Sequence, residues 1–74
     1  MIQIYLIKDL ARLTGYSVHT IKFYLKIDLL KETGRFPETH FRYFSKATQT
    51  RLNKIRQLRR EGKSLKEIKE VLKK

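Results

Sequence analysis

The chain of 74 residues contains no cysteine and no tryptophan, and only one proline and three glycines. Without cysteine it forms neither disulfide bonds nor thiolate metal sites, and it cannot sense redox state through a thiol. Its two histidines, His19 and His40, are too few for a histidine-based metal site, although carboxylates could add ligands. We therefore expect no metal and no other cofactor.

Long apolar runs are absent as well. The longest is only a few residues, so we expect neither a membrane-spanning helix nor the apolar segment of a signal peptide. Hydrophobic residues still make up 41% of the chain, a share compatible with folding. A chain this short buries only about 60% of the surface that it exposes when unfolded. The sequence thus predicts one small cytoplasmic domain over residues 1–74, with no space for a separate catalytic domain.

Acidic residues are scarce. Eighteen Lys and Arg residues stand against seven Asp and Glu residues, which gives a formal net charge of +11. Residues 1–37 hold six basic and three acidic side chains, and residues 38–74 hold twelve and four. No block of five like charges occurs, so the basic residues belong to folded faces and not to a tail. This excess predicts a polyanionic partner: nucleic acid, an acidic membrane surface or an acidic protein.

Two short helices are predicted near the N-terminus, over residues 7–14 and 18–27. Gly15 follows the first helix, where a left-handed backbone conformation would end it. Ser17 occupies the N-cap position of the second helix, where its hydroxyl can accept a backbone N–H. The link over residues 15–17 is only three residues long, and this predicts a helix-turn-helix.

The second helix has two distinct faces. An apolar stripe is formed by Val18, Ile21 and Leu25. A second stripe holds basic and aromatic side chains, His19, Lys22, Phe23 and Lys26. The major groove of DNA admits one α-helix, which must present donors to the bases while its apolar face stays in its own domain. We interpret the second stripe as a recognition surface; the alternative is an ordinary solvated face with Phe23 packed under the following hairpin.

Residues 29–44 are predicted to form a β-hairpin with a long, basic-tipped loop. Gly34 and Pro37 indicate the loop, and the alternating aromatic residues of 41–44 indicate the returning strand. Phe41 and Phe44 are expected in the core. A brief strand is also expected before the first helix, where apolar residues alternate at Ile2, Ile4 and Leu6.

Three polar residues of this hairpin are candidates for DNA contact: Arg35, His40 and Arg42. Arg42 lies between aromatic residues on a strand and should point outward. Arginine suits phosphates and minor-groove edges. For Arg35, a mobile loop charge is an equally good interpretation, because loops are generally exposed.

Two further helices are predicted, over residues 46–61 and 65–73. Ser45 is expected to cap the first of them and Gly62 to end it, while Ser64 and Glu67 form a capping box for the second. The first carries a basic stripe that could grip a nucleic-acid backbone or simply keep the surface soluble: Arg56, Arg59, Arg60 and Lys63. The apolar residues of the last helix are all expected to cover the third: Leu65, Ile68, Val71 and Leu72.

Catalysis has little support. The three glycines stand apart at 15, 34 and 62, so there is no glycine-rich phosphate loop. His19 has no visible partner for general-base chemistry. The acidic residues Asp9, Asp28 and Glu32 are interpreted as helix-end or surface charges. We expect the chain not to be an enzyme.

Four segments, in order, resemble the MerR family of bacterial transcription regulators: residues 5–24, 26–30, 41–44 and 55–68. The first two correspond to the helix-turn-helix. The run Phe41-Arg42-Tyr43-Phe44 looks like the aromatic-Arg-x-aromatic motif of the family's wing. The resemblance covers nearly the whole chain and implies a winged helix-turn-helix, mainly α-helical, with four helices and a small β-hairpin wing.

Applied position by position, the resemblance implies DNA contacts at Lys22, Phe23, Tyr24, Arg42 and Arg59. Lys22 stands where the family has Arg, which removes the bidentate fork, and Phe23 stands where it has Tyr, which removes a hydroxyl. We therefore expect more from Tyr24 and Arg42 than from Phe23. The full candidate set for DNA binding is Arg12, Ser17, His19, Thr20, Lys22, Phe23, Tyr24, Lys26, Arg35, His40, Arg42 and Arg59.

By resemblance, the chain is expected to bind double-stranded DNA sequence-specifically at the nucleoid, with RNA polymerase as a partner. Family members usually continue into a dimerising helix and an effector-binding domain, so a homodimer is expected only if a longer native chain supplies that helix. One alternative is an excisionase-like factor that bends DNA. A basic module for protein or membrane surfaces fits less well, because the apolar faces are needed for a shared core. RNA binding is disfavoured by the narrow A-form major groove.

Overall fold

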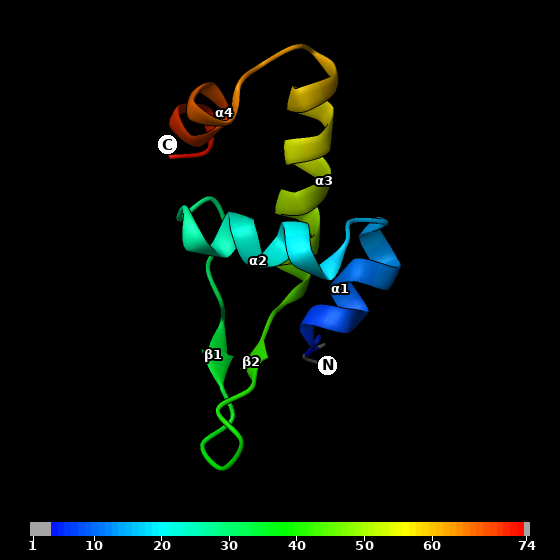
Figure 1. Cartoon of the computed structure of the whole chain (residues 1–74), viewed down its shortest axis with the longest axis vertical. Helices are drawn as coiled ribbons and strands as arrows, with labels where there is room; N and C mark the ends of the chain where they lie inside the picture. The colour runs from blue at the N-terminus through cyan, green and yellow to red at the C-terminus, as the bar shows by residue number, and fades with distance from the viewer. Residues whose placement is uncertain (1–3, 74) are drawn as a thin grey trace.

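The computed structural model describes residues 4–73. Its elements are α1 (Ile7–Thr14), α2 (Val18–Lys26), β1 (Gly34–Arg35), β2 (Arg42–Tyr43), α3 (Lys46–Arg60) and α4 (Leu65–Leu72). The two strands pair antiparallel and form a wing that projects from one end of the molecule, while α4 lies at the other end (Figure 1). The predicted four-helix fold with a small wing is thereby confirmed, and α2, α3 and α4 each end one residue earlier than expected.

The turn between α1 and α2 has the local chemistry that the sequence indicates. Gly15 adopts φ of 80°, in the left-handed region, and its N–H donates to the carbonyl of Ala11 at 2.9 Å. The Ser17 hydroxyl accepts from the Thr20 backbone N–H at 3.0 Å, which satisfies one free donor at the start of α2. These two features fix the angle at which α2 leaves α1.

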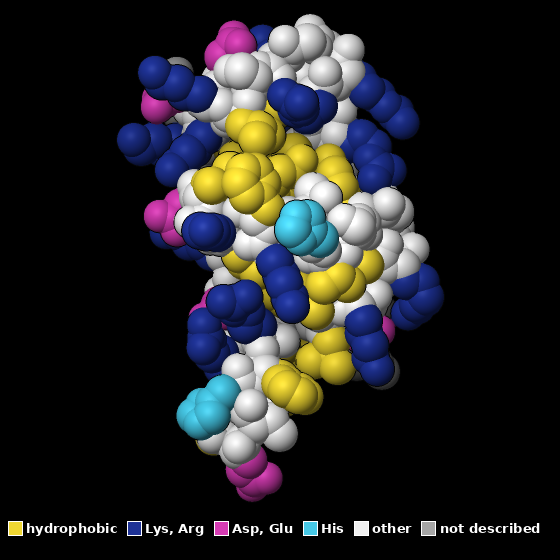
Figure 2. All heavy atoms as spheres, viewed as in Figure 1, with side chains coloured by type: hydrophobic (Ala, Val, Ile, Leu, Met, Phe, Trp, Pro, Cys, Tyr) yellow, Lys and Arg dark blue, Asp and Glu magenta, His cyan; other side chains and the backbone are white. Residues whose placement is uncertain are grey.

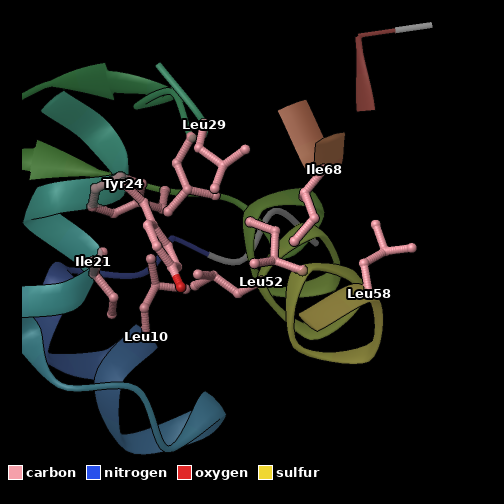
Figure 3. Packing of buried hydrophobic residues seen from close by; sticks show 10 residues of the cluster. Leu10, Ile21, Tyr24, Leu29, Leu52, Leu58 and Ile68 are labelled. Carbon is pink, nitrogen blue, oxygen red and sulfur yellow. The ribbon is translucent and has the colours of Figure 1, made fainter. Parts of the chain in front are cut away.

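One hydrophobic core joins all four helices and the base of the wing. Its fully buried members include Leu10 of α1, Ile21 of α2 and Ile68 of α4, and α3 contributes several more. Figure 3 shows the Tyr24 side chain pointing into this cluster, between Leu10 and Leu52. Each large apolar side chain buried in this way contributes roughly 1.5–3 kcal/mol to stability. The core therefore holds α2 by one face and leaves the opposite face exposed.

The C-terminal end of α2 is tied to the two last helices. The guanidinium Nε of Arg51, on α3, donates to the carbonyl of Leu29 at 2.8 Å. The ammonium of Lys69, on α4, donates to the carbonyl of Ile27 at 3.0 Å. Basic side chains thus satisfy carbonyl groups at and just after the end of α2, where the helix dipole also favours positive charge.

The chain entering α1 is paired with the base of the wing. The backbone of Tyr5 donates to Phe44 at 2.8 Å and accepts from it at 2.7 Å. This single bridge is the described part of the expected N-terminal strand, of which Ile2 lies outside the described residues. Asp9 accepts the Leu6 N–H at 2.9 Å, which confirms its interpretation as a helix-end charge.

The hairpin differs from the prediction in three respects. Gly34 and Arg35 form a strand where a loop was expected. The tip, residues 36–41, carries Glu38 and no Lys or Arg, so the prediction of a basic tip is wrong. Phe41 is 64% exposed, not in the core, because the turn at residues 36–41 closes on itself away from the helices. Phe44, at the base of the hairpin, is fully buried as expected.

Two predictions for the last helices also need correction. Ser45 does occupy the N-cap position of α3, but its side chain makes no capping hydrogen bond. On α4, Ile68 is fully buried and Leu65 and Leu72 pack against the core as expected, but Val71 is 43% exposed. The capping box of Ser64 and Glu67 is present as predicted.

Candidate nucleic-acid interface

The exposed face of α2 is the centre of the candidate interface. His19, Lys22, Phe23 and Lys26 are all exposed on this helix, opposite the buried Ile21. Figure 2 shows basic side chains around this face and at the base of the wing, with acidic side chains confined to the margins of the view. A helix presented in this way, with lysine donors and Phe23 outward and Ile21 inward, has the properties that entry into a major groove requires.

Ser17 and Thr20 lie at the N-terminal end of the same helix. Besides capping the helix, the Ser17 hydroxyl donates to Thr20 Oγ1 at 2.9 Å, so the two side chains are partners of each other. Arg12, on α1, lies 3.7 Å from Asp9 through its Nη2 atom, and its side chain is 72% exposed. Arg12 thus retains most of its freedom to reach an external anion.

The two candidate arginines of the wing form a pair. Arg35 and Arg42 are directly opposite each other in the register of β1 and β2. Glu32 lies between them: its Oε1 accepts from Arg35 Nε at 2.8 Å, and its Oε2 lies 2.9 Å from Arg42 Nε. The hydrogen bond from Arg35 lowers the pKa of the Glu32 carboxyl, and both positive charges lower it further, against an opposing effect of desolvation. Glu32 is thus more than the simple surface charge that the sequence suggested.

The remaining wing candidate, His40, is exposed at the tip and has φ of 60°. This left-handed conformation is uncommon for residues other than glycine, but it is several-fold more frequent for His than for bulky residues. It closes the turn through the His40 N–H, which donates to the carbonyl of Phe36 at 2.8 Å. His40 is the candidate furthest along the wing from α2.

Tyr24 and Phe23, two candidates for DNA contact, differ sharply in exposure. Tyr24 is 6% exposed and Phe23 is 43% exposed. Burial raises the pKa of the Tyr24 hydroxyl, and Tyr16 adds to the rise, whereas Arg59 and Arg56 oppose it. The structure gives Tyr24 a core position, from which it supports α2, and gives Phe23 the accessible surface.

Arg59 is exposed on α3, and its Nη1 donates to the carbonyl of Lys63 at 3.3 Å. Sequence reasoning missed a neighbouring contact on the same helix. The guanidinium of Arg56 lies over the ring of Tyr16, 4.5 Å from the centroid, and Tyr16 meets Tyr24 edge to face at 5.6 Å. Two signals could have indicated it: Arg56 precedes Arg59 by three residues on one helix face, and Tyr16 is an aromatic residue inside the short helix link.

Within residues 4–73, no three His, Asp or Glu side chains are grouped as metal ligands. None of the helices in this part of the chain has the length and apolar character needed to cross a bilayer. The site is therefore described by basic, aromatic and hydroxyl side chains of α1, α2, α3 and the wing.

Comparison with known proteins identifies the family. The sequence model of the MerR HTH family regulatory proteins matches residues 5–74. The chain belongs to the MerR family. This MerR chain is 32% identical over 67 residues to the multidrug-efflux transporter 1 regulator of Bacillus subtilis (strain 168), an alignment that covers 90% of the chain and 24% of that protein. Membership in a family of regulatory proteins confirms the prediction that the chain is not an enzyme.

Two solved structures share the fold. A MerR-family transcriptional regulator from Bacillus cereus superposes with a TM-score of 0.90 at 28% identity, over 97% of this chain and 53% of that one. HiNmlR, a MerR family regulator lacking the sensor domain and bound to promoter DNA, superposes with a TM-score of 0.83 at 33% identity, over 93% of this chain and 52% of its own. The MerR chain thus spans about half the length of these solved chains and about a quarter of the curated relative.

Proposed function

We propose that this MerR chain binds double-stranded promoter DNA sequence-specifically, with α2 in the major groove and the wing on the flanking backbone. One observation carries the proposal: the exposed basic face of α2 is continuous with the basic side chains of the wing on a single side of the molecule (Figure 2). The fold that it shares with a MerR regulator bound to promoter DNA supports the same arrangement.

The candidate residues divide into those that contact bases and those that contact the backbone. Lys22 is at the centre of the exposed α2 face, and a lysine there can donate to guanine O6 or N7. Phe23 can pack against a thymine methyl group or a sugar. Phosphates are contacted by the basic side chains around the helix: Arg12, His19, Lys26, Arg35, His40, Arg42 and Arg59. Ser17 and Thr20 add hydroxyls at the N-terminal end of α2, and Tyr24 acts from beneath by holding the helix.

Regulation of a promoter requires more than this interface. We infer that the protein acts in the cytoplasm at the nucleoid, with RNA polymerase as partner. A homodimer would form where a longer native chain supplies a dimerising helix. Two symmetric copies at a fixed spacing would then read a palindromic operator.

The proposed DNA binding can be tested by measuring how the affinity for duplex DNA depends on salt concentration. The five Lys and Arg side chains among the proposed phosphate contacts carry a full positive charge, whereas the two histidines are neutral at pH 7. The logarithm of the association constant should therefore fall against the logarithm of salt concentration with a slope of about −4 to −5. Fluorescence anisotropy with a labelled duplex of random sequence measures this slope. Replacing Arg42 or Arg59 with alanine should make the slope about one unit less steep in each case, because one phosphate contact is lost. Affinity that does not change with salt, or no binding at low salt, contradicts the proposal.

A further inference from the structure

The cross-strand register of the wing poses an electrostatic problem. Arg35 and Arg42 are directly opposite each other on β1 and β2, and like charges in that relation destabilise a strand pair. Each strand is only two residues long, and the backbone hydrogen bonds and the contact between the Phe36 and Tyr43 rings that hold the hairpin do not neutralise the two charges. The carboxylate of Glu32 neutralises it, because one oxygen contacts each arginine, at 2.8 and 2.9 Å.

The way in which Glu32 contacts the arginines leaves their outer nitrogens available. In both cases the closest contact is through Nε, the guanidinium nitrogen nearest the stem. A guanidinium has five N–H donors, and within residues 4–73 neither side chain makes a hydrogen bond or ion pair with any other residue. The side chains are 49% and 39% exposed, and they border an open hollow of about 350 Å³ between the end of α2 and the wing. The remaining donors can therefore reach an external phosphate.

We propose that Glu32 is a positioning residue, which holds Arg35 and Arg42 side by side as a preformed clamp for the phosphates of the DNA backbone. The inference rests on the proposed function, since it assigns DNA as the ligand of the wing. Holding a long side chain in one conformation before binding removes part of the entropy cost of binding. Glu32 thus acts through the two arginines and does not itself touch the DNA.

Glu32 also has an opposite effect, because its negative charge repels a phosphate nearby. Salt screens that repulsion, and it also weakens the partly exposed ion pairs that order the arginines, so a change of salt concentration does not separate the two effects. The two effects can be separated by mutation, because the ordering effect exists only while the arginines are present. Removing the carboxylate charge should weaken DNA binding in the wild-type wing and strengthen it in a wing without arginines.

The test uses the whole chain and a labelled duplex of random sequence, since backbone contacts do not depend on sequence. Glu32→Gln is made in the wild-type chain and in the Arg35→Ala/Arg42→Ala background. We expect Glu32→Gln to weaken binding by about three- to tenfold in the wild type, from loss of the preformed clamp, and to strengthen it by up to about twofold in the double-alanine background.

Glu38→Gln is the matched control. Glu38 lies at the wing tip and, within the described part of the chain, forms no ion pair. Its replacement by glutamine removes the same charge as Glu32→Gln does. It should strengthen binding slightly and equally in both backgrounds. Circular dichroism melting of each variant establishes that the helices remain folded.

Three results would overturn the inference. If Glu32→Gln strengthens DNA binding equally in both backgrounds, Glu32 only repels the DNA and does not position the arginines. If the double-alanine variant binds DNA with wild-type affinity, the two wing arginines do not contribute to DNA binding. The proposal that α2 binds DNA would be unaffected. Absence of duplex binding by the wild-type chain would refute the proposed function itself and this inference with it.

Discussion

Adjacent side chains on α2 serve opposite purposes. Tyr24 is almost fully buried, and its ring meets Tyr16 edge to face, so it fixes the helix to the core. Phe23, one residue earlier, is 43% exposed. Since successive helical residues are about 100° apart, the two rings leave the helix in different directions, and the ring of Phe23 is the exposed one. Phe23 and Lys22 are thus exposed on the face of α2 that we propose to contact DNA.

Replacing Lys22 with alanine tests whether α2 reads bases. The change should weaken binding to a duplex selected from a random pool by about 1–3 kcal/mol more than binding to unselected duplex, because a base contact is lost in addition to charge. Competition anisotropy measures both affinities. Lys66→Ala, an exposed lysine of α4 with the same charge change, is the control and should leave the specificity ratio unchanged. An unchanged ratio for Lys22→Ala as well would show that another element reads the sequence.

At the scale of elements, helix ends differ in how well they are capped. The Ser17 hydroxyl accepts a hydrogen bond from the first turn of α2, whereas Ser45, in the equivalent position of α3, makes none. The two serines therefore provide an internal comparison for the value of a cap. From the sequence alone, both serines are expected to cap their helices, and only the structure distinguishes them.

Ser17→Ala should lower the free energy of unfolding by about 1 kcal/mol, because a donor at the start of α2 loses its partner. Ser45→Ala should change it by much less, since no capping hydrogen bond is lost. Urea denaturation followed by circular dichroism at 222 nm measures both. Equal losses for the two variants would mean that the capping hydrogen bond contributes nothing specific at Ser17.

The cap of α4 is expected to depend on pH. Hydrogen bonds from Ser64, first of all from its backbone N–H, hold the pKa of Glu67 below its ordinary value of 4.5. A group whose pKa is lower in the folded state stabilises the fold fully above its unfolded pKa and loses this contribution as pH falls through the folded value. Stability should therefore decline in acid, below about pH 4.5, and Glu67→Gln should reduce the decline.

Urea denaturation at a series of pH values tests this expectation, with Glu70→Gln as the control. Glu70 lies one turn later on α4, and in the described part of the chain no hydrogen bond or ion pair is seen at its carboxyl. In the Glu70→Gln variant, the free energy of unfolding should change with pH in this range nearly as much as it does in the wild-type chain. A slope that Glu67→Gln does not change would contradict the role of the Ser64 hydrogen bonds.

The sequence predicts most of the helical framework because the signals for helix ends are local. Gly15, Ser17 and Ser64 each act on residues within a few positions, so their effect can be inferred without knowing the fold. The exposure of Phe41 and Val71 could not be inferred, because it depends on how far the wing and α4 extend beyond the core. Apolar character at such positions says only that burial would be favourable, not that a partner surface is within reach.

The site is predictable to a similar degree. The basic face of α2 follows from helical spacing alone, and the structure places it outside as expected. The contacts of Glu32 with two arginines depend on the strand register, which brings Arg35 opposite Arg42 from positions seven residues apart. Arg56 over Tyr16 joins residues 40 positions apart. Contacts of this kind need the tertiary fold, and periodicity carries no information about them.

At the scale of the whole molecule, charge affects assembly as well as DNA binding. A groove of about 1030 Å³ lies beside α3 and α4, and Val71 is part of its wall. The wall contains one acidic residue, Asp28, and five basic residues. The basic residues are Lys31, Arg51, Lys54, Lys69 and Lys73. A two-fold dimer places the same patch of each copy against the other. Two copies meeting through this groove would bring like charges together, and the exposed area of Val71 is too small to offset the repulsion.

We therefore expect the 74-residue chain to be a monomer at micromolar concentration, which sedimentation equilibrium measures directly. As a monomer it should bind a palindromic duplex barely better than two separate half-sites. Two copies joined by a dimerising helix should bind the palindrome about 10²–10⁴ times more tightly without any new base contact, because the second binding event becomes intramolecular. The same tandem protein with one copy carrying Lys22→Ala should lose most of this gain. A stable dimer of the unlinked chain would contradict the charge argument.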